Sequence, residues 1–112
     1  MKRIEAIVRP ERLDQVKEAF IALGHNGLTV CEVKGHGIQK GVKQQWRGEE
    51  YVIDLLPKIS VYAVVHDHEV QDCIDAVINA ARTDRIGDGK IFVTEVEQVI
   101  RIRTGESGPD AL

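Results

Sequence analysis

Residues 59–81, ISVYAVVHDHEVQDCIDAVINAA, change from a period-two pattern to a helical pattern within one short stretch. Ile59, Val61, Ala63 and Val65 alternate with other side chains, as in a strand that buries one face. From Val70 onward, apolar residues recur at spacings of three and one, which aligns them in one stripe along a helix. The stretch therefore predicts a strand followed by an amphipathic helix, whose apolar positions are Val70, Cys73, Ile74, Val77, Ile78 and Ala81.

A second strand and helix are indicated near the start of the chain. Residues 3–9 alternate, and residues 13–23 carry another helical stripe, which ends at Gly24. Residues 28–34 are rich in β-branched side chains and predict a strand, as do residues 90–96. The order strand, helix, strand, long gap, strand, helix, strand is typical of an α+β, ferredoxin-like split βαβ sandwich (βαββαβ). In that fold a four-stranded antiparallel sheet carries two helices on one face.

The other sheet face is expected to lack a cover within one chain. Ile7, Tyr62 and Val64 fall on that face, together with part of the strand at residues 28–34. An apolar surface of this kind is costly to leave in water, and symmetric association is the usual way to bury it. The pattern therefore predicts self-association, most simply as a ring.

Length and composition favour one soluble, cytoplasmic domain covering residues 1–112. The chain has 43% hydrophobic residues and a net charge of -3, from 15 Lys and Arg against 18 Asp and Glu. That charge disfavours non-specific nucleic-acid binding, and the apolar runs are far shorter than the ~20 residues of a membrane span. Cys31 and Cys73 lie in apolar segments without a CxxC spacing, so we expect both to be reduced thiols in the core.

Residues 35–57 form a gap of 23 positions with no apolar periodicity. Gly35, Gly37, Gly41 and Gly48 are spread among charged and amide side chains. Long segments of this kind inside a small domain are usually functional or disordered, although a tolerated surface insertion is the alternative. Trp46 and the run at residues 51–56 add large apolar groups, which suits a surface that docks onto a partner.

A glycine turn and two arginines suggest anion binding. In TDRIGDGKIFV (83–93), the amides of Gly87 and Gly89 can approach an anion while Lys90 supplies positive charge. The spacing is not that of a Walker motif, so the signal is weak by itself. Arg101 and Arg103, two apart on a chain expected to be extended, would project to one side and could clasp a polyphosphate. The alternative is that Arg101 and Arg103 lie on a solvated edge strand, where their charges prevent pairing with another chain.

The other polar clusters give weaker evidence for a functional site. His66, Asp67 and His68 lack a fourth metal ligand at a recognised spacing, and surface histidines are the simpler interpretation of His25 and His36. Neither a nucleophile–base order nor a carboxylate pair stands out. The sequence therefore does not favour an enzyme.

Together these segments resemble the PII family of nitrogen-regulatory signal proteins over nearly the whole chain. The strongest blocks are TDRIGDGKIFV (83–93) and VIRIRTGE (99–106), and EVKGHGIQKG (32–41), LPK (56–58) and GLTV (27–30) fall where the family has similar text. By this resemblance the gap is the T-loop (about 36–55), residues 82–90 are the B-loop, and residues 97–112 are the C-terminal segment.

The resemblance implies a homotrimer that binds ATP or ADP competitively in three clefts between subunits, with 2-oxoglutarate as an effector beside Mg-ATP. Gln39 would supply a magnesium ligand, and Lys58 would pair with a 2-oxoglutarate carboxylate, beside Gly87. One subunit would contribute Ile7, Gly35, Gly37, Gln39, Lys58, Val64, Gly87, Asp88, Gly89 and Lys90, and its neighbour Thr29, Arg101 and Arg103.

The resemblance also implies a non-enzymatic sensor. Its T-loop would bind ammonium channels, nitrogen-metabolic enzymes or modifying enzymes, so that the protein would meet a membrane only through a partner channel and nucleic acid not directly. Tyr51 occupies the position that is uridylylated in many members.

Four departures from the family pattern cluster in and around the loop. Ile38 stands where the family usually has Arg, which removes a guanidinium from the nucleotide site. Tyr62 stands where Glu is common, and the loop signature YRGAEY reads WRGEEY (46–51), with Trp46 and Glu49 as the changes. These departures keep open a divergent PII-like sensor of another small anion or nucleotide, such as bicarbonate or AMP. A slow nucleotide hydrolase lacks an evident base, and an RNA binder is disfavoured by the charge and by the small number of aromatic residues.

Overall fold

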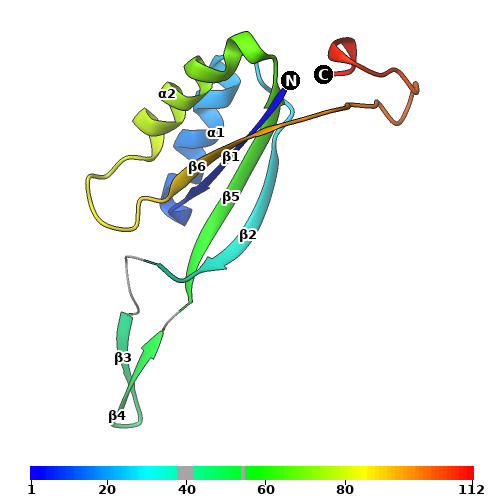
Figure 1. Ribbon diagram of the computed structural model, residues 1–112. Helices are drawn as coiled ribbons and strands as arrows, with labels where there is room; N and C mark the ends of the chain where they lie inside the picture. Colours follow the sequence, from blue (N-terminus) through cyan, green and yellow to red (C-terminus); the bar gives the residue numbers. More distant parts are fainter. Residues whose placement is uncertain (38–41, 54) are drawn as a thin grey trace.

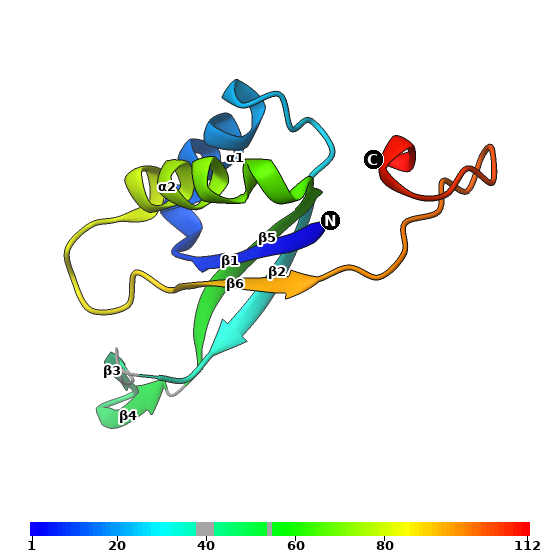
Figure 2. The same ribbon diagram turned by 45° about the horizontal axis from the view of Figure 1, so that its top comes forward.

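The computed structural model describes residues 1–37, 42–53 and 55–112. Its main sheet has four antiparallel strands in the order β2-β5-β1-β6. Both helices cover the same face of this sheet, as Figures 1 and 2 show. The ferredoxin-like prediction is confirmed. The elements are β1 (Lys2–Val8), α1 (Leu13–Ala22), β2 (Thr29–Gly35), β5 (Leu56–Val65), α2 (Val70–Ala81) and β6 (Lys90–Glu95), with 3-10 turns η1 (Pro10–Arg12), η2 (Asp67–Glu69) and η3 (Pro109–Ala111).

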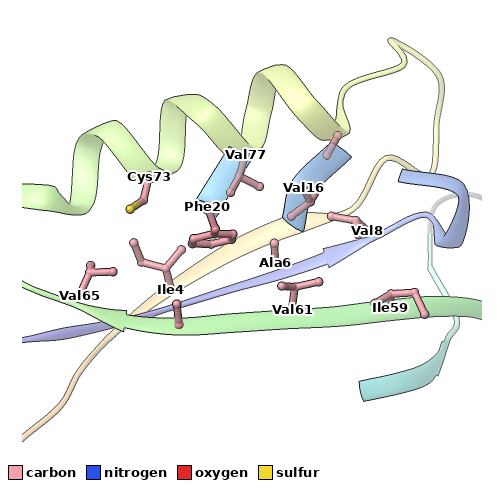
Figure 3. Packing of buried hydrophobic residues seen from close by; sticks show 12 residues of the cluster. Ile4, Ala6, Val8, Val16, Phe20, Ile59, Val61, Val65, Cys73 and Val77 are labelled. Carbon is pink, nitrogen blue, oxygen red and sulfur yellow. The ribbon is translucent and has the colours of Figure 1, made fainter. Parts of the chain in front are cut away.

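The core lies between the sheet and the two helices (Figure 3). Phe20 of α1 is 1% exposed, and it packs in one cluster with Ile4 of β1, Val61 of β5 and Val77 of α2. All four alternating residues of β5 that the sequence placed on one face are buried. Each buried Ile or Val side chain among them contributes about 1.5–3 kcal/mol by leaving water, and Ala63 contributes less. The alternation and the helical stripe thus determine which faces meet.

The helix-free face of the sheet is mixed rather than mostly apolar. The strand register places Ile7 and Tyr62 on it, but also Glu5, whose carboxylate accepts a hydrogen bond of 2.6 Å from the Ser60 hydroxyl. Cys31 lies opposite Ser60 on this face and is exposed, while Cys73 is buried. The prediction of a core thiol is therefore wrong for Cys31, because edge strand β2 receives no cover from the helices there.

Part of the long gap is a β-hairpin, contrary to the expectation of a segment without regular structure. β3 (Val42–Trp46) pairs with β4 (Glu49–Ile53) and projects beyond one end of the main sheet (Figure 1). The turn residues Arg47 and Gly48 have φ of 51° and 79°. Two consecutive positive φ values are typical of the tight turn that matches the twist of paired strands. With Arg in place of the usual Asn or Asp before the glycine, the turn signal was weak.

The C-terminal segment begins at the end of β6 remote from the hairpin (Figures 1 and 2). It folds on itself through an isolated bridge between Ile100 and Ser107. Residues 102–104 form a turn, and the Gly105 amide donates to the Arg101 carbonyl at 2.8 Å. The expectation of an extended chain through Arg101 and Arg103 is therefore wrong, because local backbone hydrogen bonds close the segment into a turn.

Candidate functional site

A groove of about 490 Å³ opens where the hairpin joins the sheet. On one side are the end of β2 and the start of β5, which lead to the hairpin. On the other is the loop between α2 and β6, which lies at the same end of the sheet in Figures 1 and 2. We call this the glycine groove; it is lined by Ile7, Gly35, His36, Gly37, Leu56, Lys58, Arg85, Gly87, Asp88, Gly89, Lys90 and Phe92.

Two glycines bring bare backbone into this groove. Gly87 and Gly89 have φ of 103° and 101°, which side chains of L-residues rarely adopt. A Cβ at Gly89 would lie 1.7 Å from the Ile7 carbonyl oxygen of β1. The loop can therefore run against the central sheet only because residue 89 has no side chain.

The Asp88 carboxylate holds the loop in shape. It accepts hydrogen bonds from the Thr83 hydroxyl, from the Thr83 amide at 2.7 Å and from the Asp84 amide at 3.0 Å. The Arg9 Nε donates to the same carboxylate at 3.0 Å. These donors, the Thr83 hydroxyl first, hold the pKa of Asp88 well below its usual range. The sequence predicted Asp88 among the ligand-binding residues; it lines the groove, and its carboxylate is engaged within the loop and with Arg9.

Two cations from the sheet bind carbonyl groups of the loop. The Lys58 Nζ donates to the Gly87 carbonyl at 2.7 Å, and Arg9 donates to the Ile86 carbonyl at 2.7 Å. Burial, followed by the charge of the nearby Arg9 guanidinium, lowers the pKa of Lys58. The groove thus combines bare amides with positive charge, which is the chemistry of an anion site.

Arg9 is the residue that sequence reasoning missed. It is buried, with 8% of its surface exposed, although Arg9 is the charged last residue of the alternating stretch 3–9 and stands directly before Pro10. Its partners Ile86 and Asp88 are 77 and 79 residues away along the chain. Local spacing holds no signal for such a pair; an arginine directly before the proline that ends a strand was the only hint.

Eight of the predicted site residues line the glycine groove together. The other predicted site residues that the structure describes lie elsewhere. Thr29 and Val64 line a second groove of about 440 Å³ at the far end of β5. Arg101 and Arg103 lie in the C-terminal segment and are not among the lining residues of either groove. Ile38 and Gln39 lie outside the described residues, as does the side chain of Tyr51.

Fold and groove together define a small ferredoxin-like protein with a glycine- and lysine-lined groove at the base of a projecting hairpin. A profile of the family described as Nitrogen regulatory protein P-II matches residues 1–106. Proteins named Nitrogen regulatory protein P-II from Rhizobium meliloti (strain 1021) and Cereibacter sphaeroides are 57% and 55% identical in sequence to this chain. The one from Pasteurella multocida (strain Pm70) is 53% identical, and each alignment spans all 112 residues of both chains. The chain belongs to the P-II family of nitrogen regulatory proteins.

The relatives are named for regulation and not for a catalysed reaction. Within the part of the chain that the structure describes, neither helix has the length and apolar character needed to cross a membrane.

Proposed function

We propose that this chain is a non-catalytic, cytoplasmic sensor that binds ATP or ADP competitively, with magnesium and 2-oxoglutarate beside ATP. The observation that carries the proposal is the glycine groove. Backbone at Gly87 and Gly89 is bare, and Lys58 and Lys90 line the same space. Polyphosphates and carboxylates are the ligands that such a combination of amides and ammonium groups recognises.

The proposal requires a neighbouring subunit. Arg101 and Arg103 stand away from the glycine groove in one chain, and so does Thr29. In a homotrimer a second copy would bring these groups to the groove, so that a polyphosphate bridges two chains. Association of this kind would also cover the helix-free sheet face, where Phe92 is 48% exposed.

The hairpin suits a role in contacting target proteins. Trp46, next to its turn, is 60% exposed, and the Arg47 guanidinium lies 4.4 Å from the centre of its ring. Exposed Trp and Arg are the residue types that most often dominate protein interfaces. Ammonium channels, nitrogen-metabolic enzymes and modifying enzymes are the proposed partners, with Tyr51 as the candidate for modification.

The second candidate is a divergent sensor of another small anion or adenine nucleotide, such as bicarbonate or AMP. Tyr62 favours it, because an aromatic ring covered on one side by the Arg3 guanidinium at 3.8 Å lines the second groove. An aromatic wall of this kind offers stacking and a hydroxyl rather than a carboxylate.

Calorimetric titration with ATP, ADP and AMP, each with and without 2-oxoglutarate and magnesium, separates these candidates. Arg103→Ala should weaken ATP binding about ten- to a hundredfold, because one charge-assisted contact is lost. It should also weaken 2-oxoglutarate binding, which depends on bound Mg-ATP. Lys17→Ala, on the exposed side of α1, is the matched loss of a cation and should bind ATP like the parent.

Lys58→Met should act on the second ligand. We expect 2-oxoglutarate binding to fall sharply while ADP binding changes little, since ADP needs neither magnesium nor 2-oxoglutarate. Light scattering on each variant checks the trimer first. A stable monomer at micromolar concentration, or unchanged ATP affinity in Arg103→Ala, would contradict the proposal, and tighter binding of AMP or bicarbonate would favour the second candidate.

A further inference from the structure

The second groove, which we call the C-terminal groove, is partly built by the last residue of the chain. Thr29, Tyr62 and Val64 form one side of it, His66 lies at the end of β5, and Leu112 provides a further wall. Leu112 is 39% exposed, so more than half of its surface is covered, and the preceding Ala111 is 9% exposed. The end of the chain therefore faces β5 across this groove, and Leu112 is partly covered rather than fully in solvent.

The same segment holds Arg101. Its guanidinium donates to the Asp110 carbonyl at 3.3 Å and to the Glu106 carboxylate at 3.4 Å. Its amide donates to the Glu106 carbonyl at 2.8 Å, and the Gly108 amide donates to the Val99 carbonyl at 3.1 Å. These contacts join Arg101 to Glu106 and Asp110, so the arginine and the last residues of the chain belong to one hydrogen-bonded segment.

We propose that Leu112 is a positioning residue for nucleotide binding, which it serves by fixing the C-terminal segment so that Arg101 is ready to meet the phosphates. This inference rests on the proposed function. Leu112 and Thr29 border the same groove, so the end of the C-terminal segment lies beside a second group that one subunit would offer its neighbour's glycine groove. An arginine that is already ordered loses less side-chain entropy when a ligand binds.

The test is a double-mutant cycle on nucleotide affinity. Leu112→Ala should weaken ATP and ADP binding about five- to tenfold, which lies within the range of coupling between residues of one hydrogen-bond network or backbone segment. In the Arg101→Ala background the same change should have no further effect, because the group that Leu112 positions is gone. Ile21→Ala, on α1 and also 39% exposed, is the matched control and should bind nucleotide like the parent.

Additive losses in the cycle, or unchanged affinity in Leu112→Ala, would overturn the inference, and recovery of affinity in Leu112→Met would support it. Amide hydrogen exchange without nucleotide gives an independent readout. Faster exchange at the amides of Arg101 and Gly108 in Leu112→Ala supports the ordering role, and unchanged exchange refutes it. A parent chain that binds no nucleotide would instead overturn the proposed function, while the exchange result still decides whether Leu112 orders the segment.

Discussion

Gly89→Ala tests how closely the B-loop must approach the sheet. The new Cβ would lie 1.7 Å from the Ile7 carbonyl oxygen, where real contacts are essentially never shorter than 3.0 Å. Residue 89 would also have to keep a φ of 101° with a side chain. Because Ile7 pairs with Lys90, relief of the overlap has to disturb the junction of β1 and β6.

We expect Gly89→Ala to lower the free energy of unfolding by about 2–4 kcal/mol. A left-handed conformation costs an L-residue about 1–2 kcal/mol. Loss of one or two backbone hydrogen bonds at the junction adds about 0.5–1.5 kcal/mol each. Displacement of the loop should also weaken ATP binding, because the bare backbone of residues 87–89 leaves its position in the glycine groove.

Urea unfolding of the parent, Gly89→Ala and Gly24→Ala measures the two contributions separately. Gly24 has a φ of 89° and nothing within 4 Å of a built Cβ, so its substitution reports the conformational cost alone. A Gly89→Ala protein that is no less stable than Gly24→Ala would refute the close approach as the reason for glycine at residue 89.

Two further predictions concern charge and core packing. Asp88 has a depressed pKa in the folded state, so its contribution to stability is complete above about pH 4 and is lost as the pH falls through the folded value. The parent should therefore lose stability more steeply below pH ~4 than Asp88→Asn, and equal slopes in acid unfolding would contradict this. Phe20→Ala should cost about 3–5 kcal/mol in urea unfolding, because Phe20 lies within the core, whereas half-exposed Ile21→Ala should cost far less.

The sequence predicts the main sheet and both helices because burial is periodic there. Ile4 and Val61 repeat every second residue, and Val77 belongs to a stripe that repeats every turn, so local spacing already contains the tertiary arrangement. Gly87 to Lys90 could also be predicted from the sequence, because these residues are neighbours along the chain and together line the glycine groove.

The features that could not be predicted from the sequence depend on contacts between residues far apart along the chain. The pair of Arg9 and Asp88 joins the end of β1 to the B-loop, and neither residue differs locally from a surface charge. Cys31 is exposed because it lies on the helix-free face of edge strand β2, which its apolar neighbours in the sequence do not reveal. Tyr62 and Val64 share one face of β5 by their alternation, and both line the C-terminal groove, whose other wall includes the distant residue Leu112.

The hairpin gives the molecule a long and narrow shape, measuring 59 Å along its longest axis and 28 and 21 Å across. Among the described residues that connect it to the main sheet, Gly35 to Gly37 on one side and Leu56 on the other also line the glycine groove. The same residues therefore border the groove and the base of the arm that carries Trp46, so a ligand that displaced them would also turn the arm.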